Sequence, residues 1–526
     1  MRTTAVAVLA AVACLGPGLD GAAQSPVFKA PPPSFANPDR RAALARAFPE
    51  VDRIMRDFVA NAHVPGAGWG IVIDGELAHA ETAGYRDLAS KASVEPDTVF
   101  RIASMTKSFT AMCILKLRDE GRLSLEDPAE KYVPELHGLS YPTSDSPKIT
   151  IRHLLSHAEG FPEDNPWGDR QLADTDGDLS RMLRGGIPFS HAPGVAYEYS
   201  NLGFAILGRV VSNVSGIPYA EYVQRNILTP LGMTSTTLEP SSVPRDKLAI
   251  GYRWEDDEWK KEPILPHGAF GSMGGMLTTI PDLARYVSAY LDAWPPRDGP
   301  ETSPIRRSSL REMQHVWQPA PASVSHADSG ATQLASGGYG FALRIAQTCD
   351  FPLVVSHSGG LPGYGSQMRW LPDYGVGIVA FGNLRYTGWG TPIDAAIAAL
   401  SATGALQPRT VHASPALERA RDAITRLVIQ WDDRSADAIA AENLFLDTDK
   451  PHRRAELDRL HAQVGQCSAG NGFDDIENPL RGEWTVPCDR GRLRVAITLA
   501  PTMPPLVQSW IVGPAPASPP ARATCR

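Results

Sequence analysis

Ser104-Met105-Thr106-Lys107 and the apolar run that follows it, Phe109 to Leu117, carry the strongest local signal in this chain. This is the only place in 526 residues where a serine precedes a lysine by three positions. The run predicts a buried helix that ends at Gly121, and side chains three positions apart on a helix share one face. The lysine amine can then reach the serine hydroxyl and activate it as a nucleophile. Chance supplies about one such pattern in a chain of this size, so a helix-capping serine followed by a solvated lysine is the alternative.

A second motif, Tyr199-Ser200-Asn201, follows the loop signal Pro193-Gly194 and precedes a Gly/Leu-rich helical pattern. A nearby lysine cation favours a phenolate, so we expect the pKa of Tyr199 to fall well below its usual value. Tyr199 would then act as a general base for Ser104 and later as an acid for the leaving group. Asn201 would hydrogen-bond the lysine and a substrate amide. The alternative is an ordinary loop tyrosine and asparagine.

A third motif, His357-Ser358-Gly359-Gly360, is expected at the end of a strand predicted over Leu353 to Ser356. Two glycines there would let a substrate backbone approach closely, as an added edge strand does. The backbone N–H groups of Gly360 and Ser104 could together form an oxyanion hole. The alternative is a strand-end turn with an incidental histidine.

These motifs, each present once and in this order, resemble the signature of the penicillin-recognising serine hydrolases. The most similar branch is that of class C β-lactamases, DD-peptidases, D-aminopeptidases and related carboxylesterases. The resemblance covers about residues 40–401 and extends to four further phrases: Phe100-Arg101-Ile102-Ala103, Ile151 to His157, Pro230-Leu231-Gly232-Met233, and Gly274 to Thr279.

The resemblance implies an α+β fold, an antiparallel sheet flanked by helices with a mostly helical lobe, and an acyl-enzyme on Ser104. Lys107 and Tyr199 would share the base role, with the division between them open. The substrate would be bound by Asn201, His357, Ser358, Gly359 and Gly360.

The expected function is therefore an exported serine hydrolase of amide or ester bonds, either a peptidase of the DD-peptidase or D-aminopeptidase type or an esterase. The alternatives are a class C-like β-lactamase and a slowly acylating penicillin-binding-like sensor or scaffold. Many β-lactamases have a lysine where this chain has His357, whose intrinsic pKa of about 6.5 leaves it mostly neutral at pH 7. We therefore expect weaker recognition of a β-lactam carboxylate. Arg369 is a candidate replacement cation and Trp167 a candidate cleft aromatic; the alternatives are a solvated arginine, which we favour, and a tryptophan that only packs.

The pattern along the chain predicts five segments. Residues 1–23 read as a secretory signal, with Arg2, a short apolar stretch and small residues before Gln24, so the protein is expected to be periplasmic or secreted. A retained anchor and a lipid attached at Cys14 are the alternatives. The remaining segments are a Pro-rich lead-in (24–39), the hydrolase domain (40–401), a linker (402–413) and a small α+β accessory domain (414–526).

The composition and the motifs of the chain exclude several classes of binding partner, and its cysteines indicate one disulfide. The formal charge of −8 comes without a basic stripe, which argues against nucleic acid. No zinc-ligand motif occurs, so we expect no metal or other cofactor. No segment after the signal predicts a transmembrane span. A small peptide, ester or β-lactam is the expected substrate, and the oligomeric state stays open. Cys113 is expected to be a free core thiol, and Cys467 with Cys488, which flank a Gly/Asn-rich segment, the favoured disulfide.

Overall fold

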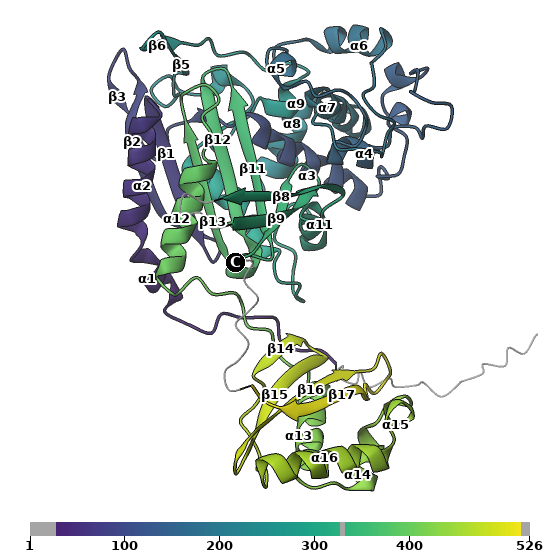
Figure 1. Cartoon of the computed structure of the whole chain (residues 1–526). Coiled ribbons are helices and arrows are strands. Elements are labelled where there is room, and N and C mark those ends of the chain that lie inside the picture. Colours follow the sequence, from purple (N-terminus) through teal and green to yellow (C-terminus); the bar gives the residue numbers. More distant parts are fainter. Residues whose placement is uncertain (1–27, 327–331, 517–526) are drawn as a thin grey trace, which may run out of the picture. The chain divides into compact units, whose positions relative to one another are not determined.

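The computed structural model describes residues 28–326 and 332–516, so the predicted signal and Cys14 lie outside the described residues. Within the described part, the chain divides into two compact units (Figure 1). One comprises residues 34–410, and the other residues 411–516 together with residues 28–33. Within the described ranges, no helix combines the length and apolar character that a membrane span requires.

The larger unit is built on a nine-stranded antiparallel sheet in the order β3-β2-β1-β13-β12-β11-β10-β9-β8 (Figure 1). Its strands are β1 (Gly66–Ile73), β2 (Glu76–Asp87), β3 (Ala92–Ser93), β8 (Gln318–His326), β9 (Thr332–Tyr339), β10 (Arg344–Thr348), β11 (Val354–Leu361), β12 (Tyr364–Leu371) and β13 (Val376–Gly382). The two ends of the unit meet where β1 pairs with β13, with Ala67 opposite Gly382. The prediction of one antiparallel sheet made from both ends of the domain is confirmed.

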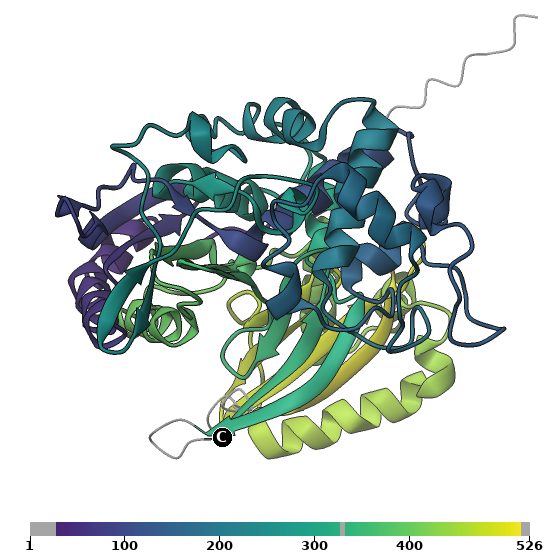
Figure 2. The ribbon, with the colours of Figure 1, turned by 90° about the horizontal axis from the view of Figure 1, so that it is seen from above.

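Helices cover both faces of this sheet (Figure 2). Along β1, Trp69 and Ile71 point into a core under α1 (Arg40–Ala45), α2 (Phe48–Asn61) and α12 (Gly390–Ala402). Gly68 and Gly70 face the opposite side, where Ile280 at the start of α10 (Ile280–Asp292) packs so closely that a Cβ on either glycine would lie within 2.8 Å of it. Large side chains and glycines thus alternate along β1, so that helices can pack closely against both of its faces.

The segment between β3 and β8 forms the helical lobe and lies over the second face of the sheet. Its helices are α3 (Thr106–Asp119), α4 (Ile151–Ser156), α5 (Asn165–Gly168), α6 (Asp176–Arg184), α7 (Asn201–Ser215), α8 (Tyr219–Val223), α9 (Gly271–Gly274), α10 and α11 (Arg307–Met313). Two small antiparallel pairs accompany them, β4 (Phe100–Arg101) with β7 (Leu277–Thr278) and β5 (Tyr252–Glu255) with β6 (Glu258–Lys261). The predicted helix after Ser104 is confirmed as α3, which is buried over most of its length and packs against α7 and α9.

Two sequence predictions were wrong in detail. The strand predicted over Tyr339 to Ile345 is split, because the chain turns between β9 and β10 with Ala342 at a φ of 56°. The third motif does not follow a strand end but lies inside β11, since pairing with β12 continues to Gly360 opposite Gly365 and beyond.

The smaller unit carries a four-stranded antiparallel sheet in the order β14-β15-β16-β17. These strands are Asp475–Asn478, Arg481–Cys488, Gly491–Leu499 and Val507–Pro514, and the helices are α13 (Pro415–Ile429), α14 (Asp433–Ile439), α15 (Leu444–Asp447) and α16 (Lys450–Val464). The predicted Cys467–Cys488 disulfide is present. Cys113, in α3 of the larger unit, is a buried free thiol, as predicted.

Candidate active site

Ser104 lies in a short 3₁₀ turn, Ala103–Met105, directly before α3. Ala103 has a φ of 49°, a left-handed conformation that costs a non-glycine residue free energy and persists only where its surroundings enforce it. The Ser366 hydroxyl of β12 enforces it in part by donating a hydrogen bond to the Ile102 carbonyl at 2.8 Å. A Cβ on Gly359 would lie 2.1 Å from the same carbonyl oxygen. The strand therefore presses against the turn and fixes the position of Ser104.

Gly359 thus has a different role from the one that the sequence suggested. The space of its missing side chain is filled by the chain itself, and a substrate backbone has no access there. The missing side chain of Gly360 faces the ring of Tyr386 instead, at 2.7 Å from an added Cβ. Only Gly360 of the two glycines lines a cleft.

Lys107 is fully buried one helical turn after Ser104. Its Nζ lies 3.1 Å from Ser104 Oγ, 2.7 Å from Asn201 Oδ1 and 2.9 Å from the Met273 carbonyl oxygen. Burial lowers the pKa of Lys107 to about 7, opposed by the negative charges of Asp169 and Asp164. Both protonation states of this amine are therefore populated near neutral pH.

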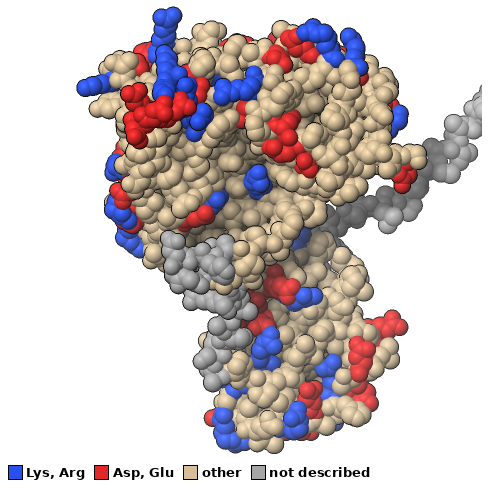
Figure 3. Space-filling model, turned by 45° about the horizontal axis from the view of Figure 1, so that its top comes forward, with Lys and Arg blue, Asp and Glu red and all other residues tan. Residues whose placement is uncertain are grey.

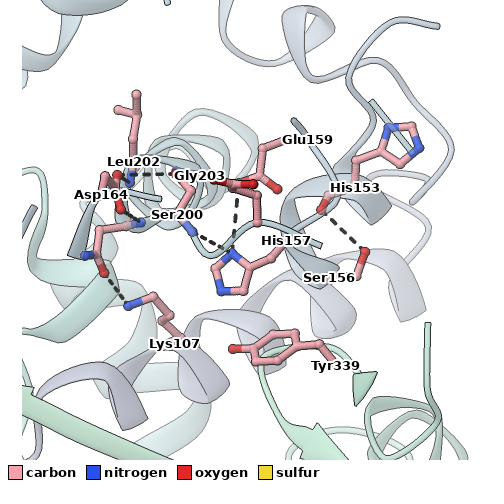
Figure 4. A network of polar contacts seen from close by, with 12 residues as sticks. Lys107, His153, Ser156, His157, Glu159, Asp164, Ser200, Leu202, Gly203 and Tyr339 are labelled. Carbon is pink, nitrogen blue, oxygen red and sulfur yellow. Dashed lines mark hydrogen bonds and ion pairs between the residues drawn. The ribbon is translucent and has the colours of Figure 1, made fainter. Parts of the chain in front are cut away.

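The second motif opens α7, and its geometry depends on two residues that the sequence analysis did not single out (Figure 4). Asp164 accepts hydrogen bonds from the backbone N–H of Asn201 at 2.6 Å and of Leu202 at 2.9 Å, where the helix dipole favours a negative charge. His157 Nδ1 accepts from the Ser200 N–H at 3.1 Å, and its ring lies 4.3 Å from that of Tyr199. The phrase Ile151 to His157 thus positions the second motif.

Tyr199 lines the cleft, but the expectation of a lowered pKa was wrong. Burial raises its pKa well above the usual value, and interaction with the Ser104 side chain opposes this only in part. The Lys107 amine lies 4.8 Å from the centre of the Tyr199 ring, so it faces the ring and its charge does not offset the loss of solvation. Tyr199 is accordingly a neutral phenol.

His357 is buried and neutral. Its Nδ1 lies 2.6 Å from the Ser358 carbonyl oxygen, which can only accept, so Nδ1 carries the proton. Nε2 is left to accept from the Tyr339 hydroxyl at 2.9 Å. Burial and the charges of Arg344 and Lys107 lower the pKa of His357 to about 3. This histidine supplies no positive charge to a substrate at any ordinary pH.

A cleft of about 340 Å³ joins these groups. It is lined by Ser104, Asn165, Pro166, Asp169, Tyr199, Arg344, His357, Ser358, Gly360 and Tyr386. Five of the residues predicted from the sequence therefore border it directly: Ser104, Tyr199, His357, Ser358 and Gly360. Lys107 and Asn201 lie behind Ser104. Figure 3 shows a hollow on one face of the larger unit, with a basic patch inside it and an acidic patch beside it.

The cation of the cleft is Arg344, which the sequence analysis did not select. Arg344 is exposed at the start of β10, and its charge lowers the pKa of His357. Arg369, the residue considered for this role, instead pairs with Asp394 of α12. Trp167 is 44% exposed and packs on Phe270, so it does not line the cleft. The sequence offered no clear clue to Arg344, because it lies within the strand predicted over Tyr339 to Ile345 and only the turn before β10 directs it to the cleft.

Comparison with known proteins agrees with this geometry. A sequence model of the beta-lactamase family matches residues 51–403. "Protein flp" of Staphylococcus aureus (strain COL) is 29% identical over 342 residues, which are 64% of this chain and 63% of that protein. "Beta-lactamase-like protein 2" of Dictyostelium discoideum is 30% identical over 344 residues, 64% of this chain and 59% of that protein. The match thus spans under two thirds of these relatives' lengths.

Two solved structures share the fold. The octameric penicillin-binding protein homologue from Pyrococcus abyssi superimposes with a TM-score of 0.55 at 21% identity, covering 86% of this chain and 96% of that one. A penicillin binding protein from Bacillus halodurans gives a TM-score of 0.53 at 24% identity, covering 66% and 99%. The family match covers the site and confirms the resemblance seen in the sequence: the chain belongs to the beta-lactamase family.

Proposed function

We propose that this chain hydrolyses amide bonds in small peptides through an acyl-enzyme on Ser104, as a peptidase of the DD-peptidase or D-aminopeptidase type. Esters, whose carbonyls are more reactive than those of amides, are expected to be cleaved as a side reaction. The observation that carries the proposal is the environment of Lys107, a dry amine in contact with a serine hydroxyl.

The partners of Lys107 support it as the base. A neutral amine has two N–H donors and one lone pair. The Asn201 and Met273 oxygens can only accept, so they take both donors. The lone pair is then left for the Ser104 hydroxyl, 3.1 Å away. As Ser104 Oγ bonds to the substrate carbonyl carbon, its proton moves to Lys107 Nζ.

The remaining steps use groups that border the cleft. The backbone N–H groups of Ser104 and Gly360 are the proposed donors to the oxyanion. Tyr199, a neutral phenol beside Ser104, donates its proton to the departing nitrogen and is reprotonated from Lys107. Water then attacks the acyl carbon as Lys107 accepts its proton, and Lys107 passes this proton to Ser104 Oγ as the bond between Oγ and the acyl carbon breaks.

Arg344 supports a substrate that carries a carboxylate. An exposed guanidinium in a cleft binds a carboxylate with charge-assisted hydrogen bonds. Its charge acts on Tyr199, the proposed proton donor to the leaving nitrogen, and on His357, which favours a carboxylate on the leaving group. The favoured substrate is therefore a short peptide whose leaving group ends in a free carboxylate.

The same observation favours a second candidate, hydrolysis of β-lactams. The expectation of weak β-lactam recognition rested on the absence of a cation at His357, and Arg344 supplies one from a neighbouring strand. A slowly acylating sensor would use the same groups and differ in the rates at which the acyl group forms on Ser104 and is removed by water.

One panel separates these functions: D-amino-acid amides, D-Ala-D-Ala peptides, nitrocefin and p-nitrophenyl esters, each with the wild type and Ser104→Ala. Peptide turnover that is lost in Ser104→Ala supports the peptidase. Turnover of nitrocefin alone supports a β-lactamase, and a persistent penicillin adduct by intact-mass spectrometry supports a sensor. Retained turnover in Ser104→Ala would contradict acylation at this serine.

We also propose that the protein is exported after removal of residues 1–23 and acts in the periplasm or outside the cell, on the evidence of the sequence pattern. N-terminal sequencing of the mature protein tests this. A mature chain that begins at Cys14 would show a lipid-anchored form instead.

A further inference from the structure

Asp169 is a charged group of the cleft that the proposed mechanism does not use. It follows α5, is 3% exposed, and lines the cleft together with Ser104. Its Oδ2 accepts a hydrogen bond from the Tyr386 hydroxyl at 3.0 Å. Its Oδ1 is buried and has no hydrogen-bond partner within residues 28–326 and 332–516. A buried carboxylate oxygen without a partner is costly, which suggests that its partner is a ligand.

The neighbouring Asp164 shows what a purely structural carboxylate looks like in the same loop. Both of its oxygens are bonded at the N-terminus of α7, to two backbone N–H groups and to the Ser200 hydroxyl at 3.4 Å. Asp164 does not line the cleft. The helix therefore accounts for Asp164 and leaves Asp169 without a structural explanation.

Tyr386 is the residue whose hydroxyl is hydrogen-bonded to the Asp169 carboxylate in the cleft. Its ring lies against Gly360 on one wall of the cleft, and its hydroxyl reaches Asp169 on the other. The residue is 47% exposed, and it lies in the segment between β13 and α12. Its side chain can swing away without opening the core, and the carboxylate is then free to pair with a bound group.

Asp169 and Arg344 supply opposite charges to the cleft that contains Ser104. Arg344 is assigned to the carboxylate of the leaving group, whose nitrogen belongs to the cleaved amide bond. A free ammonium group of a short peptide therefore belongs to the acyl portion. The Asp169 carboxylate, which lines the cleft with Asn165 and Tyr386 and has one unpartnered oxygen in the described residues, can pair with it.

We propose that the Asp169 carboxylate binds an ammonium group on the acyl portion of the substrate, so that the cleft selects short peptides with a free amine on one side of the cleaved bond and a free carboxylate on the other. The small volume of the cleft, about 340 Å³, fits a peptide of a few residues better than a long chain. The inference rests on the proposed peptidase activity and names its substrate class.

The test compares three dipeptides that end in D-alanine: D-Ala-D-Ala, its N-acetyl derivative, and Nα-acetyl-D-Lys-D-Ala. The second lacks an ammonium group, and the third carries it on the side chain. The wild type should cleave at least one of the two amine-bearing peptides about tenfold or more faster, as kcat/KM, than the N-acetyl derivative. Whether the first or the third is preferred identifies an α-ammonium or a side-chain ammonium.

Asp169→Asn keeps the size of the side chain and removes its charge, so the preference should fall to within about twofold. Tyr386→Phe, the matched control, removes the competing hydroxyl and leaves the carboxylate, so the preference should persist or grow. Labelling of Ser104 by a fluorophosphonate shows that each variant retains a folded site. Should Asp169→Asn not fold, competitive inhibition of the wild type by D-alanine and by N-acetyl-D-alanine replaces it, with tighter binding expected for D-alanine.

Equal cleavage of free and acetylated peptides, or a preference that survives Asp169→Asn, would overturn the inference and leave the peptidase standing. Failure to cleave any peptide, with Ser104 still labelled, would overturn the proposed peptidase and this inference with it.

Discussion

The floor of the cleft and its two walls satisfy their polar groups in opposite ways. The floor comprises Ser104, Lys107, Asn201 and His357, whose side chains are buried and bonded within the protein. The walls carry Arg344, exposed, and Asp169, with one oxygen unpartnered in the described part of the chain. The fold itself stabilises the floor, so chemistry is preorganised there. The described residues leave one oxygen of Asp169 unpaired and the Arg344 guanidinium exposed in the cleft, so specificity is expected there.

The largest effect should come from the floor. Lys107→Ala removes the proposed base and should lower kcat/KM by about 10³-fold or more for every substrate, as general-base removal does. Lys116→Ala is the matched control on the same helix, because Lys116 pairs with Glu120 outside the cleft. Steady-state kinetics on an ester and a peptide would measure both. A loss of activity confined to one substrate class would show that Lys107 selects substrates and is not the general base.

A wall residue should instead affect one class of substrate. Arg344→Gln should lower kcat/KM by about 10- to 100-fold for peptides with a free carboxylate, since a charge-assisted pair is lost. The corresponding peptide amides should change by only a few-fold. Arg369→Gln, which removes an arginine paired with Asp394, serves as the control. An equal loss on acids and amides would show that Arg344 supports the fold of the site and does not select substrates.

The contrast between Arg344 and Arg369 also marks how far the sequence could predict this site. Motifs that act through local spacing, as in Ser104 and Lys107, could be predicted because one helical turn sets their geometry. The single antiparallel sheet could also be predicted, because strand signals lie at both ends of the domain. Arg344 could not be found in this way, since a turn within the strand predicted over Tyr339 to Ile345 decides which side chain enters the cleft.

Ionisation was the other property that the sequence could not provide. Proximity to a lysine predicted a phenolate at Tyr199, whereas burial raises its pKa and lowers that of Lys107. Burial depends on the packing of α3, α7 and α9 around the pair, which no motif encodes. The unpartnered oxygen of Asp169 likewise follows from three-dimensional packing.

The pH dependence of kcat/KM should report the ionisation of Lys107 in the floor and the influence of Asp169 in the wall on it. Protonated Lys107 cannot accept the Ser104 proton, so kcat/KM should rise with pH through the pKa of about 7 and level off above it. His357, with a pKa of about 3, should add no inflection near 6.5.

The carboxylate of Asp169 favours the Lys107 cation, so Asp169→Asn should lower the pKa of Lys107 and move the rise to lower pH. A pH–rate profile on a neutral ester, which carries no group for either wall, measures this shift. If the midpoint of the rise in kcat/KM lies at the same pH in Asp169→Asn as in the wild type, the two groups do not interact.

The smallest expected effect concerns the hydrogen bond that keeps His357 in place. Tyr339→Phe removes the donor to His357 Nε2 and leaves a buried acceptor unsatisfied, which costs about 1–3 kcal/mol of unfolding free energy. Urea denaturation would measure this loss.

Because Nδ1 remains bonded to the Ser358 carbonyl, the imidazole should stay neutral and its tautomer should not change. Selectivity for carboxylate substrates should then survive in Tyr339→Phe, since it depends on Arg344. A variant that lost this selectivity together with stability would show that the floor and the walls are energetically coupled through β11 and β10.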